Sequence, residues 1–361
     1  MSKNKKMIGL VCMIMMIALI LAACGGNNNE ANNKANNKAN NKADAVKDTP
    51  KATEPAAKEE GPKYNFRLAE THPADYPTTK GDMRFADLVK EKSNGRITID
   101  VFPSAQLGEE KAAIEQVQLG AIEFTRISSG PLGEFNKDFG VFSLPYIFDN
   151  DEHVWKFLKS DAATKLLDSL ETSRLKGLAY YSSGSRSFYS TKPLTSIEDL
   201  KGLKIRVIQN KLNIDIMDAL GASATPMDYG EVYSALQTGV IDAAENNYPS
   251  YYSSKHYEVA KNYIVDSHQR VPEVLMMSKD VWDKLSAEDQ AIIKESAVES
   301  TDFQRDQWAA YEKVSEDAVR AAGVTITEVT DVKPWQDAVK PVIEANAVEF
   351  KEVLDAINAA R

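Results

Sequence analysis

The sequence predicts an α/β protein in which strands and helices alternate along the chain. Segments with period-two alternation, such as 96–101, are separated by segments with apolar residues at helical spacing, such as 78–93. Glycines at 120, 221 and 239 follow predicted helices, as is typical of helix C-termini. The length of 361 residues favours two domains.

The predicted elements follow in order from residue 64. Strands are expected at 64–68, 96–101, 121–126, 176–182, 186–190, 203–207 and 240–243, and helices at 78–93, 109–119, 151–170, 197–200, 211–220 and 230–238. This alternation is typical of an α/β layer with a mostly parallel sheet.

One further segment predicts an unusually long helix. Between Ser286, a plausible N-cap, and Ala322 there is no Pro or Gly, and Gly323 follows. At 1.5 Å per residue such a helix extends about 54 Å, which is longer than one domain of this size is wide. It would therefore cross both domains; the alternative is two helices separated by a kink.

The first 62 residues predict export and anchoring. Lys3, Lys5 and Lys6 precede an apolar run over 7–23, as in a secretory signal; a single membrane-spanning helix is the alternative. Leu-Ala-Ala-Cys24-Gly resembles the bacterial lipobox, which favours a signal peptide over 1–23 and lipidation of Cys24. Residues 24–62, with their ANNK repeats, are expected to form a disordered tether. The protein is therefore predicted to be extracytoplasmic, held by lipid on the outer face of the cell membrane.

Composition and motifs argue against several functions. The net charge of −10 disfavours nucleic acid as a partner. The four histidines, at 72, 153, 256 and 268, include no pair at metal-ligand spacing. No nucleophile elbow or phosphate-binding glycine loop is present in the sequence. We therefore expect no catalytic residues, no metal and no cofactor, and we do not expect an enzyme.

Arginine placement indicates an anion pocket. Arg206 lies between Ile205 and Val207 in a predicted strand, where burial is costly unless the guanidinium meets an anion. The alternative is an edge strand with Arg206 facing water. Arg126 and Arg186 lie at predicted strand ends, and Asn246 follows another strand. Ligands of open α/β sheets bind where such loops converge.

The chain also resembles a known family. The segments 200–207 (LKGLKIRV), 220–223, 231–242 and 245–246 strongly resemble the TRAP transporter solute-binding proteins, as do 95–97, 102–108 and 143–148. The resemblance implies a two-lobed, periplasmic-binding-protein-like clamp with a long helix spanning both lobes. Lobe I is expected to comprise 64–183 with 272–311, and lobe II 184–271 with 312–361.

The resemblance also implies roles for individual residues. Arg206 would form the salt bridge to the ligand carboxylate, with Arg186 in support; Asn246 would bind the ligand and Tyr229 would pack on it. The common Asp-Gly-x-Glu-Asn turn is here Asp-Ala-Ala-Glu-Asn, without its Gly.

Other features resemble the branch of the family that takes sugar acids. They are Arg126 as a third arginine, 187–189 (SFY) and 268–273 (HQRVPE). Glu70 and His72 fall in the region that contacts polar groups of the ligand. A hexuronate such as glucuronate or galacturonate is therefore favoured, and a C4-dicarboxylate is the alternative.

The resemblance implies membrane partners. The protein would deliver its organic acid to the membrane subunits of a TRAP permease driven by an ion gradient. An alternative is that it presents the ligand to a membrane sensor kinase. A surface enzyme is a third possibility, disfavoured by the missing catalytic motifs.

Overall fold

The computed structural model describes residues 61–361. The predicted signal peptide, the predicted lipidation site at Cys24 and nearly all of the predicted tether lie outside these residues. Within the described part, no helix combines the length and the apolar character needed to cross a membrane.

Five strands form the first of two sheets: β1 (Tyr64–Ala69), β2 (Ile97–Phe102), β3 (Phe124–Ser128), β4 (Leu175–Tyr181) and β10 (Glu273–Ser278). Their order is β2-β1-β3-β10-β4. β1 pairs in parallel with β2 and β3, whereas β10 runs antiparallel to β3 and β4. We call this sheet and the helices around it the first lobe.

The helices of the first lobe are α1 (Pro77–Lys92), α2 (Glu110–Gln118), α3 (Ser129–Leu132), α4 (Asp151–Leu158), α5 (Asp161–Ser169) and α10 (Lys279–Trp282), with 3₁₀ turns at Lys137–Ser143 and Leu170–Ser173. The prediction of one helix over 151–170 is wrong. The Ser160 side chain accepts a hydrogen bond from the backbone N–H of Ala163 and starts a second helix there.

Six strands form the second sheet: β5 (Arg186–Ser190), β6 (Lys204–Val207), β7 (Ser223–Pro226), β8 (Ala243–Asn246), β9 (Asn262–Gln269) and β11 (Thr325–Glu328). Their order is β11-β9-β5-β8-β6-β7. β6 pairs in parallel with β7 and β8, and β11 with β9, whereas β5 runs antiparallel to β8 and β9.

The prediction of mostly parallel strands is confirmed in both sheets, since a single strand of each runs antiparallel to the others. The antiparallel strands are β5 in one sheet and β10 in the other. Each is the strand that follows a crossing of the chain from the other sheet, over 182–185 and 270–272.

Around the second sheet, which defines the second lobe, lie α6 (Lys211–Ala219), α7 (Val232–Thr238), α8 (Tyr248–Ser253), α9 (His256–Val259) and α12 (Lys333–Asn346), with 3₁₀ turns at Ile197–Leu200 and Tyr229–Glu231. α6 begins where the Asn210 side chain accepts a hydrogen bond from the Asn213 N–H at 2.8 Å. α7 ends at Gly239, which has a left-handed backbone with φ 75°, as predicted.

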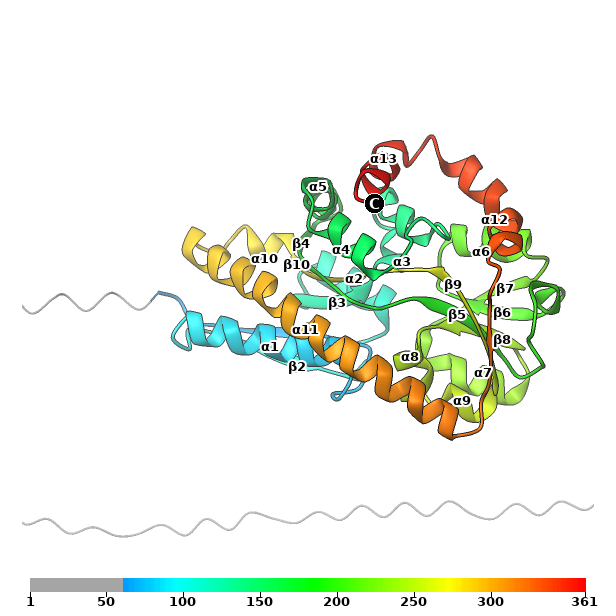
Figure 1. Ribbon diagram of the computed structural model, residues 1–361. Helices are drawn as coiled ribbons and strands as arrows, with labels where there is room; N and C mark the ends of the chain where they lie inside the picture. The colour runs from blue at the N-terminus through cyan, green and yellow to red at the C-terminus, as the bar shows by residue number, and fades with distance from the viewer. Residues whose placement is uncertain (1–60) are drawn as a thin grey trace, which may run out of the picture. The chain divides into compact units, whose positions relative to one another are not determined.

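A single helix of 35 residues, α11 (Ala287–Ala321), connects the lobes. It begins at Ser286, whose Oγ accepts from the backbone N–H of Asp289 at 3.1 Å. It packs against α1 and β4 in the first lobe and against α8 in the second (Figure 1). The predicted long helix is confirmed, and the alternative of two helices with a kink is wrong.

The last helix, α13 (Lys351–Ala359), packs against α4. His153 Nε2 in α4 lies 2.7 Å from the backbone oxygen of Ile357. The two-lobed clamp is confirmed by the two sheets, while the predicted lobe boundaries stay a prediction.

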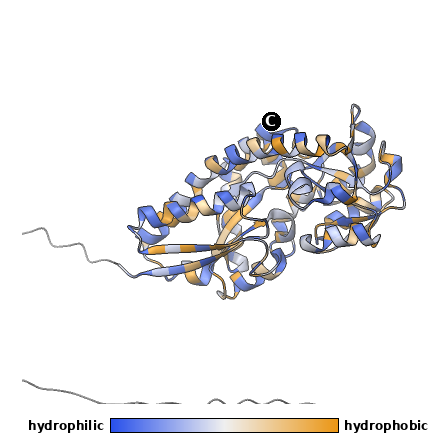
Figure 2. Ribbon diagram, turned by 90° about the horizontal axis from the view of Figure 1, so that it is seen from below, coloured by the Kyte–Doolittle hydropathy of each residue, from blue (hydrophilic) through white to orange (hydrophobic). Residues whose placement is uncertain are grey.

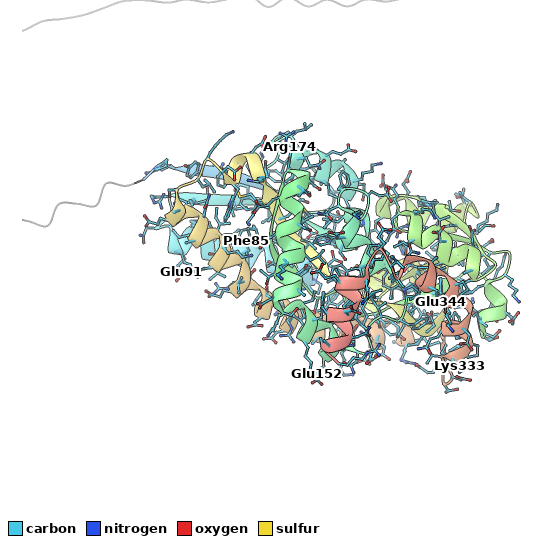
Figure 3. The ribbon with its side chains drawn as sticks, turned by 90° about the horizontal axis from the view of Figure 1, so that it is seen from above. Phe85, Glu91, Glu152, Arg174, Lys333 and Glu344 are labelled. Carbon is cyan, nitrogen blue, oxygen red and sulfur yellow. The ribbon has the colours of Figure 1, made fainter. Side chains whose placement is uncertain are left out.

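Apolar residues concentrate on the strands and on the inner faces of the helices (Figure 2). Phe85 of α1 is fully buried inside the first lobe, whereas Glu152, Lys333 and Glu344, also labelled in Figure 3, are exposed. Other charged side chains, among them Arg126, Arg186 and Arg206, are buried instead.

Candidate functional site

A cavity between the two sheets gathers most of the predicted site residues. It holds about 380 Å³ of space not filled by atoms, part of it open to solvent. Its lining comes from both lobes: Thr71, His72, Glu110, Ser128 and Glu273 from the first, and Arg186, Arg206, Ile208, Tyr229, Asn246, Asn247 and Ser250 from the second.

A larger, shallower hollow beside this cavity is lined in part by Lys111, Glu134 and Lys211. Those charged side chains are exposed to solvent. The smaller cavity instead brings buried arginines and carboxylates together, so it is the candidate site.

Of the two arginines that line the cavity, Arg206 is the one that forms no ion pair with a described carboxylate. It lies on β6, between β8 and β7, and is 5% exposed, so the edge-strand alternative is wrong. Its Nε and Nη2 donate to the backbone oxygen of Met227 at 3.1 and 2.9 Å, and no described Asp or Glu forms an ion pair with it. Burial lowers its pKa from the ordinary value. A buried guanidinium with a free edge is suited to an anionic ligand.

Arg186, by contrast, is paired within the second lobe. Its Nε and Nη2 donate to the two carboxylate oxygens of Glu245 at 2.5 and 2.8 Å, and its Nη1 donates to Asn246 Oδ1 at 2.9 Å. Burial alone would raise the pKa of Glu245, but attraction to Arg186 outweighs it and lowers that pKa to about 2. Asn246 ends β8, three residues later than the predicted strand.

His268 contacts Glu245, the carboxylate partner of Arg186. Its Nδ1 lies 2.8 Å from Asp266 Oδ2 and its Nε2 lies 3.7 Å from Glu245 Oε2. Burial lowers the pKa of a histidine, but the two carboxylates raise the pKa of His268 to about 9. It is therefore protonated at neutral pH and holds Glu245 against Arg186.

The structure places Arg126 differently from its expected role. It lies within β3, is fully buried, and is surrounded by three carboxylates of the first lobe. Its Nε donates to Glu70 Oε2 at 2.7 Å and its Nη2 to Glu70 Oε1. Its Nη1 donates to Glu273 at 2.6 Å and lies 3.4 Å from Glu110. The guanidinium is thus occupied by protein groups, and Glu70 is occupied by Arg126.

His72 and Tyr229 lie at one end of the cavity. The His72 ring stacks on Tyr76 at 3.9 Å between centroids and meets the Tyr229 ring edge-on at 5.3 Å. Burial, helped by the charge of Arg126, lowers the pKa of His72 to about 3, so it is neutral. Tyr229 donates to Ser250 O at 3.1 Å and lies 5.7 Å from the Arg206 guanidinium.

Sequence reasoning missed two carboxylates of the lining, Glu110 and Glu273. Glu110 starts α2 directly after the Gln-Leu-Gly-Glu segment, and Glu273 starts β10. Glu273 ends the 268–273 segment and Glu110 follows the 102–108 segment, but nothing in their spacing showed that they meet at Arg126. Among the described residues, no group of three or more His, Cys, Asp or Glu has a geometry that could hold a metal ion.

Residues 68–349 match the family described as bacterial extracellular solute-binding protein, family 7 (DctP). The chain belongs to this family. A relative, a solute-binding protein of Chromohalobacter salexigens, is 39% identical over 283 residues, covering 78% of this chain and 84% of the relative. The predicted resemblance to the TRAP solute-binding proteins, which are extracytoplasmic receptors, is confirmed.

Solved structures of TRAP periplasmic solute-binding proteins share the fold. The protein of Bradyrhizobium sp., in complex with α/β-D-galacturonate, is 44% identical with a TM-score of 0.80 and covers 81% of this chain and 99% of its own. The protein of Pseudomonas putida F1, with bound D-glucuronate, is 40% identical with a TM-score of 0.80, covering 82% and 97%.

Proposed function

We propose that this family 7 receptor captures a hexuronate and delivers it to a TRAP permease. The observation that carries the proposal is Arg206, a buried guanidinium with no carboxylate partner among the described residues, facing a cavity whose other wall carries Glu110 and Glu273. The cation matches one ligand carboxylate, and the acidic wall matches hydroxyl groups. The two solved relatives above contain galacturonate and glucuronate.

In this proposal each site residue has a distinct task. Arg206 forms a two-point salt bridge with the ligand carboxylate, and Arg186, whose charge is balanced by Glu245, holds Asn246 in place on the same wall. Asn246 and His72 contact ligand hydroxyl groups, and Tyr229 packs on the sugar ring. Arg126 and Glu70 do not contact the ligand. Glu70 binds Arg126, which in turn holds Glu273 of the cavity wall in position.

A ligand screen tests the proposal. Thermal unfolding of the purified protein is followed with galacturonate, glucuronate, succinate or malate, and calorimetry gives Kd for each ligand that shifts Tm. A ligand at 100 times its Kd stabilises the folded state by about 2.7 kcal/mol. We expect stabilisation by the uronates alone. Stabilisation by succinate or malate but not by a uronate would indicate the C4-dicarboxylate alternative.

We also propose that lipid on Cys24 anchors the receptor to the outer face of the cell membrane. The support is the Leu-Ala-Ala-Cys24-Gly segment after the apolar run. Lipid on Cys24 would supply more than one acyl chain, which stable anchoring needs. Mass spectrometry of the N-terminal peptide would detect the acyl chains, and Cys24→Ala should release the protein from cells. Permease genes beside this gene would support delivery to a transporter, whereas a sensor-kinase gene there would favour ligand presentation.

A further inference from the structure

The two walls of the cavity carry opposite charge. The second-lobe wall contributes the cations Arg186 and Arg206. The first-lobe wall contributes Glu110 and Glu273 together with Thr71, Ser128 and His72. Because His72 is neutral, with its pKa lowered to about 3 by burial, no described residue lining that wall is a cation.

The positive charge behind the acidic wall is too small to cancel it. Arg126 faces the three carboxylates of Glu70, Glu110 and Glu273. With all three carboxylates ionised, the excess is two negative charges, and protonation of Glu273, whose pKa is raised to about 7, reduces it to one. Arg126 is fully buried and does not line the cavity, so a ligand meets the carboxylates rather than the guanidinium.

Both wall carboxylates are held in fixed positions. Glu110 Oε1 accepts from the Ser128 N–H at 2.7 Å and lies 3.4 Å from Arg126 Nη1. Glu273 Oε2 accepts from the same Nη1 at 2.6 Å. Such bonds restrict the rotamers of both side chains, so neither can turn away from an unsuitable ligand without losing a charge-assisted hydrogen bond.

We propose that Glu110 and Glu273 are specificity-determining residues: they accept hydrogen bonds from ligand hydroxyl groups and exclude a second carboxylate, which restricts the pocket to monoanionic polyhydroxy acids. Arg126 is a positioning residue for both. The inference rests on the proposed function and adds to it the reason for rejecting dianions.

The physical argument is one of matching donors and charge. An ionised carboxylate is only an acceptor, so a hydroxyl group can satisfy it whereas a second carboxylate cannot. Placing like charges against one another also carries a direct electrostatic cost, which is how many sites reject a wrong partner. With the ligand carboxylate at Arg206, the far end of the ligand lies against this acidic wall.

Two open-chain acids provide a matched test. Galactonate and galactarate have the same carbon chain and the same hydroxyl pattern, but galactarate has a second carboxylate in place of a terminal hydroxymethyl group. The Kd of each is measured by calorimetry with the purified protein, or by competition against galacturonate. We expect galactonate to bind more tightly by about tenfold or more, because like charges meet only in the galactarate complex.

Glu110→Gln and Glu273→Gln test the two residues separately. Glutamine keeps an acceptor oxygen for Arg126 but gains N–H donors and loses the charge, so the preference for galactonate should fall at least about threefold in each variant. The matched control is Glu115→Gln, an exposed position on the same helix as Glu110, which should keep the wild-type ratio.

A pH series of the unmodified protein provides a readout that does not depend on the variants folding. Burial and the neighbouring Glu110 and Glu70 raise the pKa of Glu273 to about 7, against the opposing effect of Arg126. As the pH rises through about 7, Glu273 loses its proton, so the preference for galactonate should grow.

Equal affinity for the two acids, a preference that does not change with pH, or an unchanged ratio in both glutamine variants would overturn the inference. Failure of galactonate to bind at all would do the same. Binding of the uronates separates the two proposals. If neither galacturonate nor glucuronate binds, the proposed function is contradicted, whereas normal uronate binding with equal galactonate and galactarate affinities contradicts only this inference.

Discussion

Arg186 and Glu245 form a two-point ion pair inside the second lobe, with Nε and Nη2 of the arginine at 2.5 and 2.8 Å from the two carboxylate oxygens. Both side chains are almost fully buried. The pair fixes one wall of the cavity before any ligand arrives, so the charge of Arg186 is already neutralised and the ligand carboxylate depends on Arg206.

Removing one partner of the pair should destabilise the fold. Glu245→Gln leaves Arg186 buried with no full countercharge, and breaking a buried pair in this way costs about 3–5 kcal/mol. Denaturant unfolding measures the change. The control is Glu316→Gln, which breaks an exposed pair with Arg320 on α11 and should change the free energy of unfolding by about 1 kcal/mol or less. Equal effects would contradict the structural role given to Glu245.

Arg206→Lys should weaken ligand binding by about tenfold or more, because hydrogen bonds to charged groups contribute about 1.5–3 kcal/mol and lysine cannot reproduce the two-point geometry. Calorimetry with galacturonate measures the loss. Arg305→Lys is the control, since Arg305 lies over the Trp155 ring and outside the cavity. Unchanged affinity in Arg206→Lys would place the carboxylate elsewhere.

His268 should make the fold less stable in alkaline solution. Its pKa rises from 6.5 to about 9 on folding, through Asp266 and Glu245 and against the effect of burial. A raised pKa means that the histidine stabilises the fold fully below pH 6.5 and loses this contribution as the pH passes through 9. The free energy of unfolding, measured from pH 6 to 9.5, should therefore decline in the wild type.

The matched variant is His268→Gln, which does not titrate. Its unfolding free energy should change less over the same pH interval than that of the wild type. Two parallel curves would show that another group causes the decline.

Gly184→Ala should destabilise the crossing between the sheets more than a matched glycine substitution does. Gly184 has φ +60°, and an added Cβ would lie 2.6 Å from Glu312 Oε1 and 3.0 Å from Trp308 Nε1. Gly202 also has a positive φ, +75°, but an added Cβ there meets nothing within 4 Å. Gly202→Ala should therefore lower stability only by the left-handed strain of about 1–2 kcal/mol.

The measurement is the Tm of the two alanine variants in one buffer. A lower Tm for Gly184→Ala is expected, and the difference reports the steric clash with α11. Similar Tm values would mean that α11 moves aside at little cost.

Much of the architecture could be predicted because its signals are local. The Pro-free and Gly-free run after Ser286 predicted α11, and the glycine at 239 predicted the end of α7. The break at Ser160 was missed because a capping serine does not interrupt the helical spacing of apolar residues. The start of β8 was also predicted wrongly, at residue 240 instead of Ala243, because the sequence alone does not show where pairing with β5 begins.

The site was harder to predict because its contacts are distant in sequence. Arg206 stood out as a charged residue within an apolar strand. The partners of Arg126 did not, since Glu273 lies 147 residues away from it. Whether a buried arginine faces a ligand or a protein carboxylate depends on such long-range contacts, and spacing along the chain does not contain them.

The length of α11 limits how the two lobes can move. One unbroken helix packs on α1 at one end and on α8 at the other, without a proline or glycine at which it could fold. Any rotation of one sheet relative to the other must either bend this helix elastically or slide it across one of its neighbours. A bent helix stores energy, so a closing motion that bends α11 creates a restoring force that reopens the cavity once the ligand has left.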